Sequence, residues 1–312
     1  MGIVARMVTL EKDGIPGYVA HPEGPGRRPG VLMVHHAHGV TADYKIDAYR
    51  LAGLGFNVFA PSLFNMFGVL GTTHIGQGAE LQAKHSDGEF LGKMDEAWRY
   101  LVERMDSDPA RTAAIGHCMG GRLLIPFAAD HPSLRAIVLY YPSVRDEPET
   151  SHRPRHAFRL ARTLTCASLV FAAGKDFIAT PAIQGPLWQS FIANGQLVEW
   201  HFFSDANHGF RHPDNDGFQP YYADLAWPLV TSFLQRVVEA PMSHAWLCGV
   251  ATRRRAGRGR HSARRARDVD RRLDRPAQGV DRWSSALAGV RRAAAPTPPS
   301  PSGSAPTGSR AT

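Results

Sequence analysis

The 312-residue sequence predicts an α/β protein in which a mostly parallel central sheet is covered by helices on both faces. Short, continuous apolar runs recur along the chain, and such runs are typical of strands buried on both faces. Segments with the period of an amphipathic helix separate these runs. The alternation implies right-handed crossovers between parallel strands, and it continues to about residue 240, which predicts a single domain over residues 1–240.

The first residues depart from this alternation. Residues 4–10 and 17–21 flank a Lys-Asp-Gly turn signal, and we expect them to form a β-hairpin at one edge of the sheet. The alternation then begins with a buried strand at residues 31–34, a helix over about residues 43–54 and a strand at residues 57–60 that ends before a proline.

The remaining elements continue in the same order. The further predicted strands are residues 112–115, 136–141, 167–172 and 197–203. The further predicted helices are residues 92–105, 119–129, 186–194 and 221–238. Strands that alternate with helices in this way form one doubly covered sheet.

Composition changes after residue 240. Residues 253–275 are rich in Arg, Ala and Gly, and residues 293–312 are nearly all Ala, Pro, Ser, Gly and Thr. Such segments cannot bury enough apolar area to offset chain entropy, so a disordered tail is expected over residues 241–312. An inert tail is favoured over one that attracts polyanions.

The tail also holds the positive charge of the chain. Residues 241–312 contain 15 Arg and 4 Asp, a net charge of +11, which leaves −3 of the overall +8 on residues 1–240. We therefore expect no specific nucleic-acid partner. The chain has no apolar run of about 18 residues and no signal-peptide core at its start, and its three cysteines are scattered, so no membrane partner and a cytoplasmic location are expected.

The strongest chemical signal is the hexapeptide Gly116-His117-Cys118-Met119-Gly120-Gly121. It lies between a predicted strand and a predicted helix, which is the position of a nucleophile on a strained strand-to-helix turn. The helix N-terminus favours a thiolate and a developing oxyanion at Cys118. The alternative is a buried structural thiol. Cys166 and Cys248 lack this setting and are interpreted as core and tail residues.

A thiol nucleophile requires a base and an acid that orients the base. Asp176 follows the strand predicted at residues 167–172, and His208 follows the last predicted strand. The order nucleophile, acid, histidine is that of the α/β-hydrolase fold. Asp176 could instead be a turn residue and His208 a surface histidine, whereas Asp205 is a rival acid that is better interpreted as a solvated loop residue.

These residues resemble the dienelactone hydrolase family, whose hallmark is a G-x-C-x-G-G motif with Cys, Asp and His in this order. The resemblance covers about residues 1–240. It implies an α/β-hydrolase fold, no cofactor, a monomer, and hydrolysis of a small enol lactone during aromatic degradation. It also implies an oxyanion hole formed by the backbone amides of Met119 and Ala37.

The sequence departs from the family at two points. His36 stands where the family carries a Glu that contacts the thiol, so an imidazole could stabilise the thiolate instead. Arg211 is the best candidate for holding a substrate carboxylate, because residues 61–92 contain no Arg. His35, His36 and His38 also suggest a metal site, but neighbouring residues of a strand end point to opposite sides, so no metal is expected.

The ordered triad favours hydrolysis over two other functions. A redox-sensing thiol protein or a binding module of the same fold would not need Asp176 and His208 in this order. The substrate class is left open between a dienelactone-like lactone and the ester or thioester of a carboxylesterase or thioesterase.

Overall fold

The computed structural model describes residues 2–71 and 73–239. The tail expected over residues 241–312, and with it Cys248, lies outside the described residues. In the part of the chain that the structure describes, no helix is both long and apolar enough to cross a bilayer.

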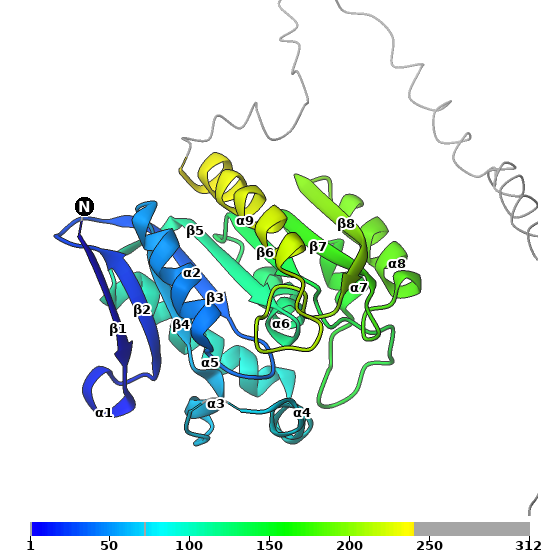
Figure 1. Ribbon diagram of the computed structural model, residues 1–312, viewed down its shortest axis with the longest axis horizontal. Helices are drawn as coiled ribbons and strands as arrows, with labels where there is room; N and C mark the ends of the chain where they lie inside the picture. Colours follow the sequence, from blue (N-terminus) through cyan, green and yellow to red (C-terminus); the bar gives the residue numbers. More distant parts are fainter. Residues whose placement is uncertain (1, 72, 240–312) are drawn as a thin grey trace, which may run out of the picture. The chain divides into compact units, whose positions relative to one another are not determined.

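The described residues contain one sheet of eight strands, with the order β1-β2-β4-β3-β5-β6-β7-β8 (Figure 1). The edge strands β1 and β2 pair antiparallel, β2 pairs antiparallel with β4, and all later pairs are parallel. The strands are β1 (Ile3–Val8), β2 (Gly17–Pro22), β3 (Arg28–Val34), β4 (Asn57–Pro61), β5 (Ser107–His117), β6 (Ala136–Tyr140), β7 (Ala167–Lys175) and β8 (Val198–Asn207).

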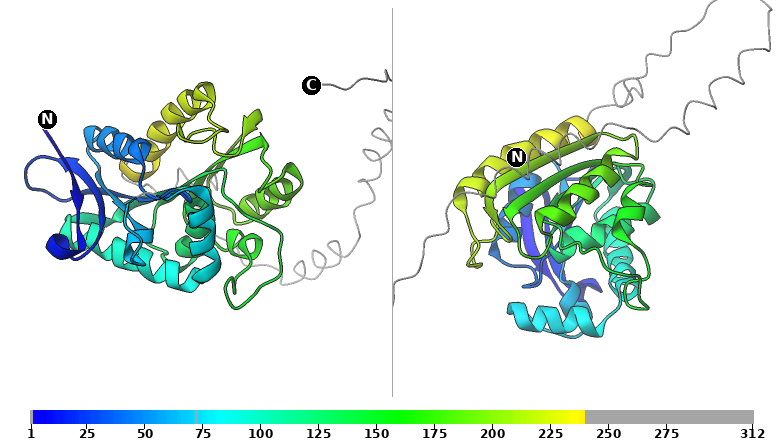
Figure 2. Two further views of the ribbon diagram at one scale, coloured as in Figure 1. Left: turned by 60° about the horizontal axis from the view of Figure 1, so that its bottom comes forward. Right: turned by 90° about the vertical axis from the view of Figure 1, so that its right-hand side faces the viewer.

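Helices cover both faces of this sheet. Helices α2 and α9 lie on one face, and α5, α6 and α8 lie on the other (Figure 2). The helices are α1 (Leu10–Asp13), α2 (Ala42–Gly53), α3 (Leu63–Met66), α4 (Ile75–Lys84), α5 (Asp87–Arg99), α6 (Met119–Asp130), α7 (Ala157–Ala161), α8 (Pro181–Ile192) and α9 (Pro220–Leu234). π-Helical turns at Tyr100–Arg104 and Gln235–Glu239 extend α5 and α9. The predicted α/β-hydrolase architecture is confirmed.

Every strand and helix predicted from the apolar pattern is present, although some bounds differ. Helix α5 begins at Asp87, five residues before the predicted start, because Ser86 and Glu89 form a capping box. The Ser86 hydroxyl accepts the Glu89 amide at 3.2 Å, and the Glu89 carboxylate accepts the Ser86 amide at 2.8 Å. The short helices α1, α3, α4 and α7 were not predicted, and α1 stands where a turn was expected between the first two strands.

The parallel strands bring distant residues to one edge of the sheet. His36 follows β3, Cys118 follows β5, Asp176 follows β7 and His208 follows β8. Because the carboxyl ends of parallel strands meet at the same edge, these four side chains gather there.

Candidate active site

Cys118 occupies a strained turn between β5 and α6. Its backbone angles are φ 52° and ψ −113°, a region that residues with a side chain rarely adopt. The turn is possible because its neighbours are small: a Cβ on Gly120 would lie 2.2 Å from the Val34 carbonyl oxygen, and a Cβ on Gly116 would lie 2.6 Å from the Gly120 backbone. The sharp turn predicted from the hexapeptide is therefore present.

Backbone hydrogen bonds hold this turn. The Cys118 amide donates to the Tyr140 carbonyl at 3.0 Å, and the Cys118 carbonyl accepts the Ser143 amide at 3.0 Å. Cys118 is a free thiol with 9% of its surface exposed, and it lines a cavity at the sheet edge. Cys166 is also a free thiol, but it is buried in the core as predicted.

Asp176 and His208 are brought together behind this cavity. His208 Nδ1 donates to Asp176 Oδ2 at 2.9 Å. The other oxygen of Asp176 accepts the amides of Ile178 and Ala179 at 2.8 and 2.9 Å, so the carboxylate is held from both sides. Both residues are buried, which is not what surface turn and loop residues would show.

The environment of His208 favours its charged form. Burial lowers the pKa of His208, but the hydrogen bond to Asp176 and the neighbouring Cys118 outweigh it and raise the pKa to about 10. The other ring nitrogen, Nε2, is buried without a hydrogen-bond partner among residues 2–71 and 73–239. It is therefore free to exchange a proton with the thiol, with water or with a bound substrate.

The rival acid Asp205 lies elsewhere. It forms an ion pair with Lys175, and 65% of its side chain is exposed. The interpretation of Asp205 as a solvated residue is confirmed.

The cavity beside Cys118 has a volume of about 150 Å³. It is mainly apolar at its mouth, where Phe177 is 79% exposed and its ring lies 5.7 Å from that of His208. The cavity is lined by His36, Ala37, His38, Ile75, Cys118, Tyr141, Phe177, Ile178, His208, Gly209, His212 and Asn215. Its size suits a small substrate.

The two residues expected to form the oxyanion hole lie next to this cavity. Met119 is the first residue of α6, so its amide has no acceptor within the helix. Ala37 lines the cavity, and Thr73 fixes its loop by donating from its hydroxyl to the Ala37 carbonyl at 2.7 Å. Both amides are thus candidates for binding an oxyanion.

His36 lines the cavity, but it brings no charge to the thiol. Burial, followed by the neighbouring His212, lowers the pKa of His36 well below its ordinary value, so the ring is neutral at pH 7. A cationic His36 is therefore not available to stabilise a thiolate. His35 points away, since its Nε2 accepts the Leu63 amide at 3.1 Å.

The structure places Arg211 away from the cavity wall. The guanidinium is buried, and it forms an ion pair with the equally buried Asp47 of α2. Arg211 is not among the residues that line the cavity. Because the Asp47 carboxylate already neutralises the Arg211 guanidinium, little positive charge remains to bind a substrate carboxylate. The expected anchoring role of Arg211 therefore has no geometric support.

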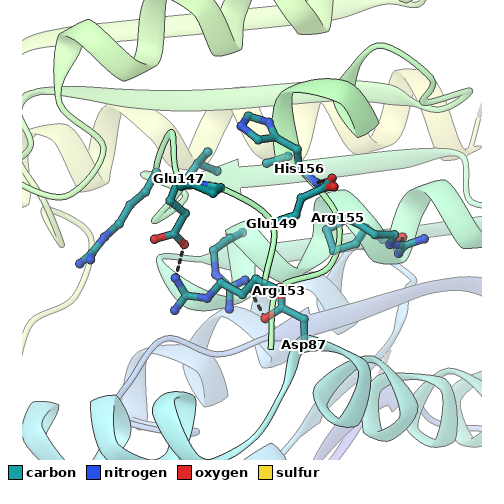
Figure 3. Close-up of a pocket in the computed structure, with 12 residues that line it drawn as sticks. Asp87, Glu147, Glu149, Arg153, Arg155 and His156 are labelled. Atoms are coloured by element: carbon teal, nitrogen blue, oxygen red, sulfur yellow. Dashed lines mark hydrogen bonds and ion pairs between the residues drawn. The ribbon is translucent and has the colours of Figure 1, made fainter. Parts of the chain in front are cut away.

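A second hollow on the surface does not compete for the role of active site. Arginines and glutamates around residues 147–156 turn toward one another there, with Arg153 joined to Glu147 (Figure 3). Arg122 and Asp87, which also line this hollow, form an ion pair at 2.6 Å. These ion pairs offset much of the charge in the hollow, and its volume of about 30 Å³ is much smaller than that of the cavity beside Cys118.

Sequence reasoning missed three features of the site. Phe177 and Ile178 follow Asp176 directly, and a hydrophobic pair next to the predicted acid was a usable signal. His212 lies four residues after His208, and its ring centroid is 3.8 Å from that of His36, with the two rings tilted by 39°. Because His212 meets His36 only through the fold, no local pattern indicated this contact.

Comparisons with known proteins agree with this architecture. Residues 15–238 match the Dienelactone hydrolase family. A protein from Methylorubrum extorquens that is named a carboxymethylenebutenolidase is 29% identical over 230 residues, which cover 72% of this chain and 79% of that protein. A protein of the same name from Salmonella typhi is 27% identical over 227 residues, covering 70% and 82%. A solved structure of a Klebsiella pneumoniae dienelactone hydrolase has a TM-score of 0.67 at 23% identity, covering 76% of this chain and 100% of that one.

The fold and the family match define a hydrolase of the α/β-hydrolase class. The chain belongs to the dienelactone hydrolase family. It is a dienelactone hydrolase-like hydrolase, as the resemblance of its motifs implied.

Proposed function

We propose that this hydrolase opens a small lactone or ester through Cys118, His208 and Asp176, with a thioester on Cys118 as the intermediate. One observation carries the proposal. His208 is held by the Asp176 carboxylate through Nδ1, while its Nε2 is unpartnered within the described residues and Cys118 lines the same cavity. This is the arrangement of orienting acid, base and nucleophile that acyl transfer requires.

In the resting enzyme the proton resides on His208. With its pKa raised to about 10, the imidazole is protonated at neutral pH, and an imidazolium next to Cys118 favours the thiolate. The amino end of α6 adds the positive end of a helix dipole. We infer that Cys118 attacks as a thiolate, with its proton held on His208.

Acylation consumes that proton. The Cys118 thiolate attacks the carbonyl carbon, and the amides of Met119 and Ala37 stabilise the resulting oxyanion. The ring C–O bond then breaks, and the leaving oxygen takes the proton from His208 Nε2. The products of this step are a thioester on Cys118 and a neutral imidazole.

Deacylation returns the proton to His208. Once the thiolate has been consumed, the neutral His208, still oriented by Asp176, removes a proton from water as the water oxygen attacks the thioester. The C–S bond breaks, the acid is released, and the pair of thiolate and imidazolium forms again. Every step uses groups that line or adjoin the cavity.

The substrate class rests on the relatives and on the cavity. The relatives' name refers to a carboxymethylenebutenolide, a small enol lactone. A cavity of about 150 Å³ suits a molecule of that size. An enol oxygen is also a good leaving group when a thiolate attacks the lactone carbonyl. We extend this class, and with it a role in aromatic degradation, to the chain. We place the reaction in the cytoplasm, because a reducing compartment keeps free thiols such as Cys118 and Cys166 reduced.

A substrate panel tests the proposal. Dienelactone, p-nitrophenyl acetate and a simple thioester are compared in steady-state assays of wild type, Cys118→Ala and Cys166→Ala, the second substitution being a matched control at a buried thiol outside the cavity. The proposal predicts fastest turnover of the lactone, loss of activity in Cys118→Ala, and retention in Cys166→Ala. Preference for the thioester would indicate a thioesterase, and full activity in Cys118→Ala would refute the mechanism.

A further inference from the structure

Three histidines converge on the wall of the catalytic cavity. His36 and His38 come from the loop after β3, and His212 comes from the turn that follows His208. One ring nitrogen from each lies within 4.8 Å of the other two. The rings of His36 and His38 meet edge to face, with their Nδ1 atoms 3.2 Å apart.

This spacing is close to that of ligands on one metal ion. Zinc binds imidazole nitrogens at roughly 2.0–2.1 Å, so two nitrogens on a tetrahedral ion are about 3.3 Å apart. The His36 and His38 pair already has this separation. The remaining nitrogens need to approach by no more than about 1.5 Å from their limit of 4.8 Å, which a small rotation of an imidazole accomplishes.

His212 provides an independent argument, because its ring is buried without hydrogen bonds. Only 2% of its surface is exposed, and neither of its ring nitrogens has a hydrogen-bond partner among the residues that the structure describes. A buried polar atom without a partner is rare in a native protein. An ion bound by one nitrogen of His212 would satisfy that atom.

A carboxylate stands behind the same ring. Asp43 Oδ2 lies 3.5 Å from His212 Nδ1, and Thr41 donates a hydrogen bond to the carboxylate of Asp43. Metal-binding histidines commonly present their second nitrogen to a carboxylate, which orients the ring. The Asp43 carboxylate would accept a shorter hydrogen bond from His212 Nδ1 while His212 Nε2 binds the ion.

His36 offers either edge of its ring. Its Nδ1 accepts the His38 amide at 3.0 Å, and its Nε2 lies 3.5 Å from the Thr41 hydroxyl. His38 Nδ1 lies 3.2 Å from the same His36 nitrogen, so an ion bound there would replace the His38 amide as the partner of His36 Nδ1.

We propose that His36, His38 and His212 form a binding site for a divalent transition-metal ion such as Zn²⁺. Three histidines leave the fourth position of a tetrahedral ion open. All three residues line the cavity that also contains Cys118, so this position faces the substrate space. If the proposed lactone hydrolysis is right, the ion supplies the positive charge for a substrate carboxylate that Arg211, paired with Asp47, does not.

Direct metal binding tests the site independently of catalysis. Full-length protein is titrated with Zn²⁺ by calorimetry, and with Co²⁺ by visible absorption, in a Cys118→Ser background that removes the thiol as a ligand. One equivalent of Zn²⁺ and the visible bands of four-coordinate Co²⁺ are expected. Asp43→Asn should weaken Zn²⁺ binding about 10- to 100-fold, and His212→Gln or His38→Gln should weaken it by at least as much.

The control variant is His152→Gln, which removes an exposed imidazole outside the cavity and should leave the affinity for this equivalent unchanged. His38 is only half-buried, so its variant keeps the result interpretable if His212→Gln does not fold. Binding that persists in both His38→Gln and His212→Gln, or that disappears in Cys118→Ser alone, would overturn the proposal. A wild-type enzyme inactive on every ester would refute the proposed function and leave this result intact.

Discussion

Replacing Asp176 by Asn isolates the role of the orienting acid. In the wild type, Asp176 Oδ1 accepts two backbone amides and Oδ2 accepts the His208 Nδ1 proton. An Asn side chain can keep the two amide contacts through its oxygen, so the loop is preserved. Its NH₂ group then faces His208 Nδ1 and can only donate, which forces the imidazole into the tautomer with the proton on Nε2.

The expected loss is large because that tautomer cannot act as a base toward water. The corresponding change in a Ser-His-Asp hydrolase lowers kcat about 10⁴-fold, and the same factor is expected here. It corresponds to about 5 kcal/mol of transition-state stabilisation, at about 1.4 kcal/mol for each factor of ten. Binding of the substrate should change little, since Asp176 does not line the cavity.

The same variant has a pH signature. The pKa of His208 is raised from 6.5 to about 10 in the folded protein, so this group adds stability that is fully present below pH 6.5 and is lost as the pH rises through 10. Asp176→Asn removes the main group that raises the pKa. The fall of Tm between pH 6.5 and 10 should therefore be shallower than in the wild type.

Steady-state kinetics and thermal unfolding of Asp176→Asn measure both effects. If kcat decreases by less than about tenfold and Tm depends on pH as in the wild type, then Asp176 neither orients the His208 ring nor raises its pKa. A loss of folding would be visible at once in the same unfolding scans, and the milder Asp176→Glu then replaces it.

Three further substitutions test the surroundings of the site. Gly120→Ala should lower the free energy of unfolding by about 1–3 kcal/mol, because the new Cβ would clash with the Val34 carbonyl. An ordinary Gly→Ala change in a helix has the opposite sign. Denaturant unfolding that shows no loss of stability would contradict this prediction. Arg211→Met should lower the free energy of unfolding by about 3–5 kcal/mol near pH 8, because it leaves the Asp47 carboxylate buried without its partner. The loss should be smaller in acid, because burial raises the pKa of Asp47 to about 6 and the carboxylate then takes up a proton. Equal losses at both pH values would be inconsistent with a buried ion pair. Asp205→Asn should leave kcat within about twofold and stability within about 1 kcal/mol, whereas a large decrease in kcat would make Asp205 the catalytic acid.

Local sequence patterns predicted the framework of this protein well. Buried parallel strands have continuous apolar runs, and β3, β5, β6 and β7 were found on that basis. The nucleophile position also has a local cause, since Gly116 and Gly120 must be small for the turn at Cys118 to form. Asp176 and His208 could be placed because each follows a strand whose carboxyl end reaches the same edge of the sheet.

What could not be predicted depends on contacts between distant segments. Arg211 lies eight residues after the strand predicted at residues 197–203, yet its charge is neutralised by Asp47, which lies 164 positions earlier. His212 approaches His36 across a similar separation, so neither a charge count nor a motif reveals the cluster. The short helix α4 escaped notice because only Gly78 and Leu81 of its residues are buried, which leaves little apolar period to detect.

Trapping the acyl intermediate tests the central proposal most directly. Wild type and His208→Gln are mixed with dienelactone, quenched in acid within milliseconds to seconds, and examined by intact-protein and peptide mass spectrometry. The proposed mechanism predicts an adduct with the mass of the whole lactone on the peptide containing Cys118, because ring opening releases no fragment. In His208→Gln this adduct should form more slowly, because the leaving oxygen lacks its proton donor, but it should persist, because deacylation lacks its base. Turnover by the wild type with no adduct on Cys118 in either protein, or an adduct on another residue, would contradict it.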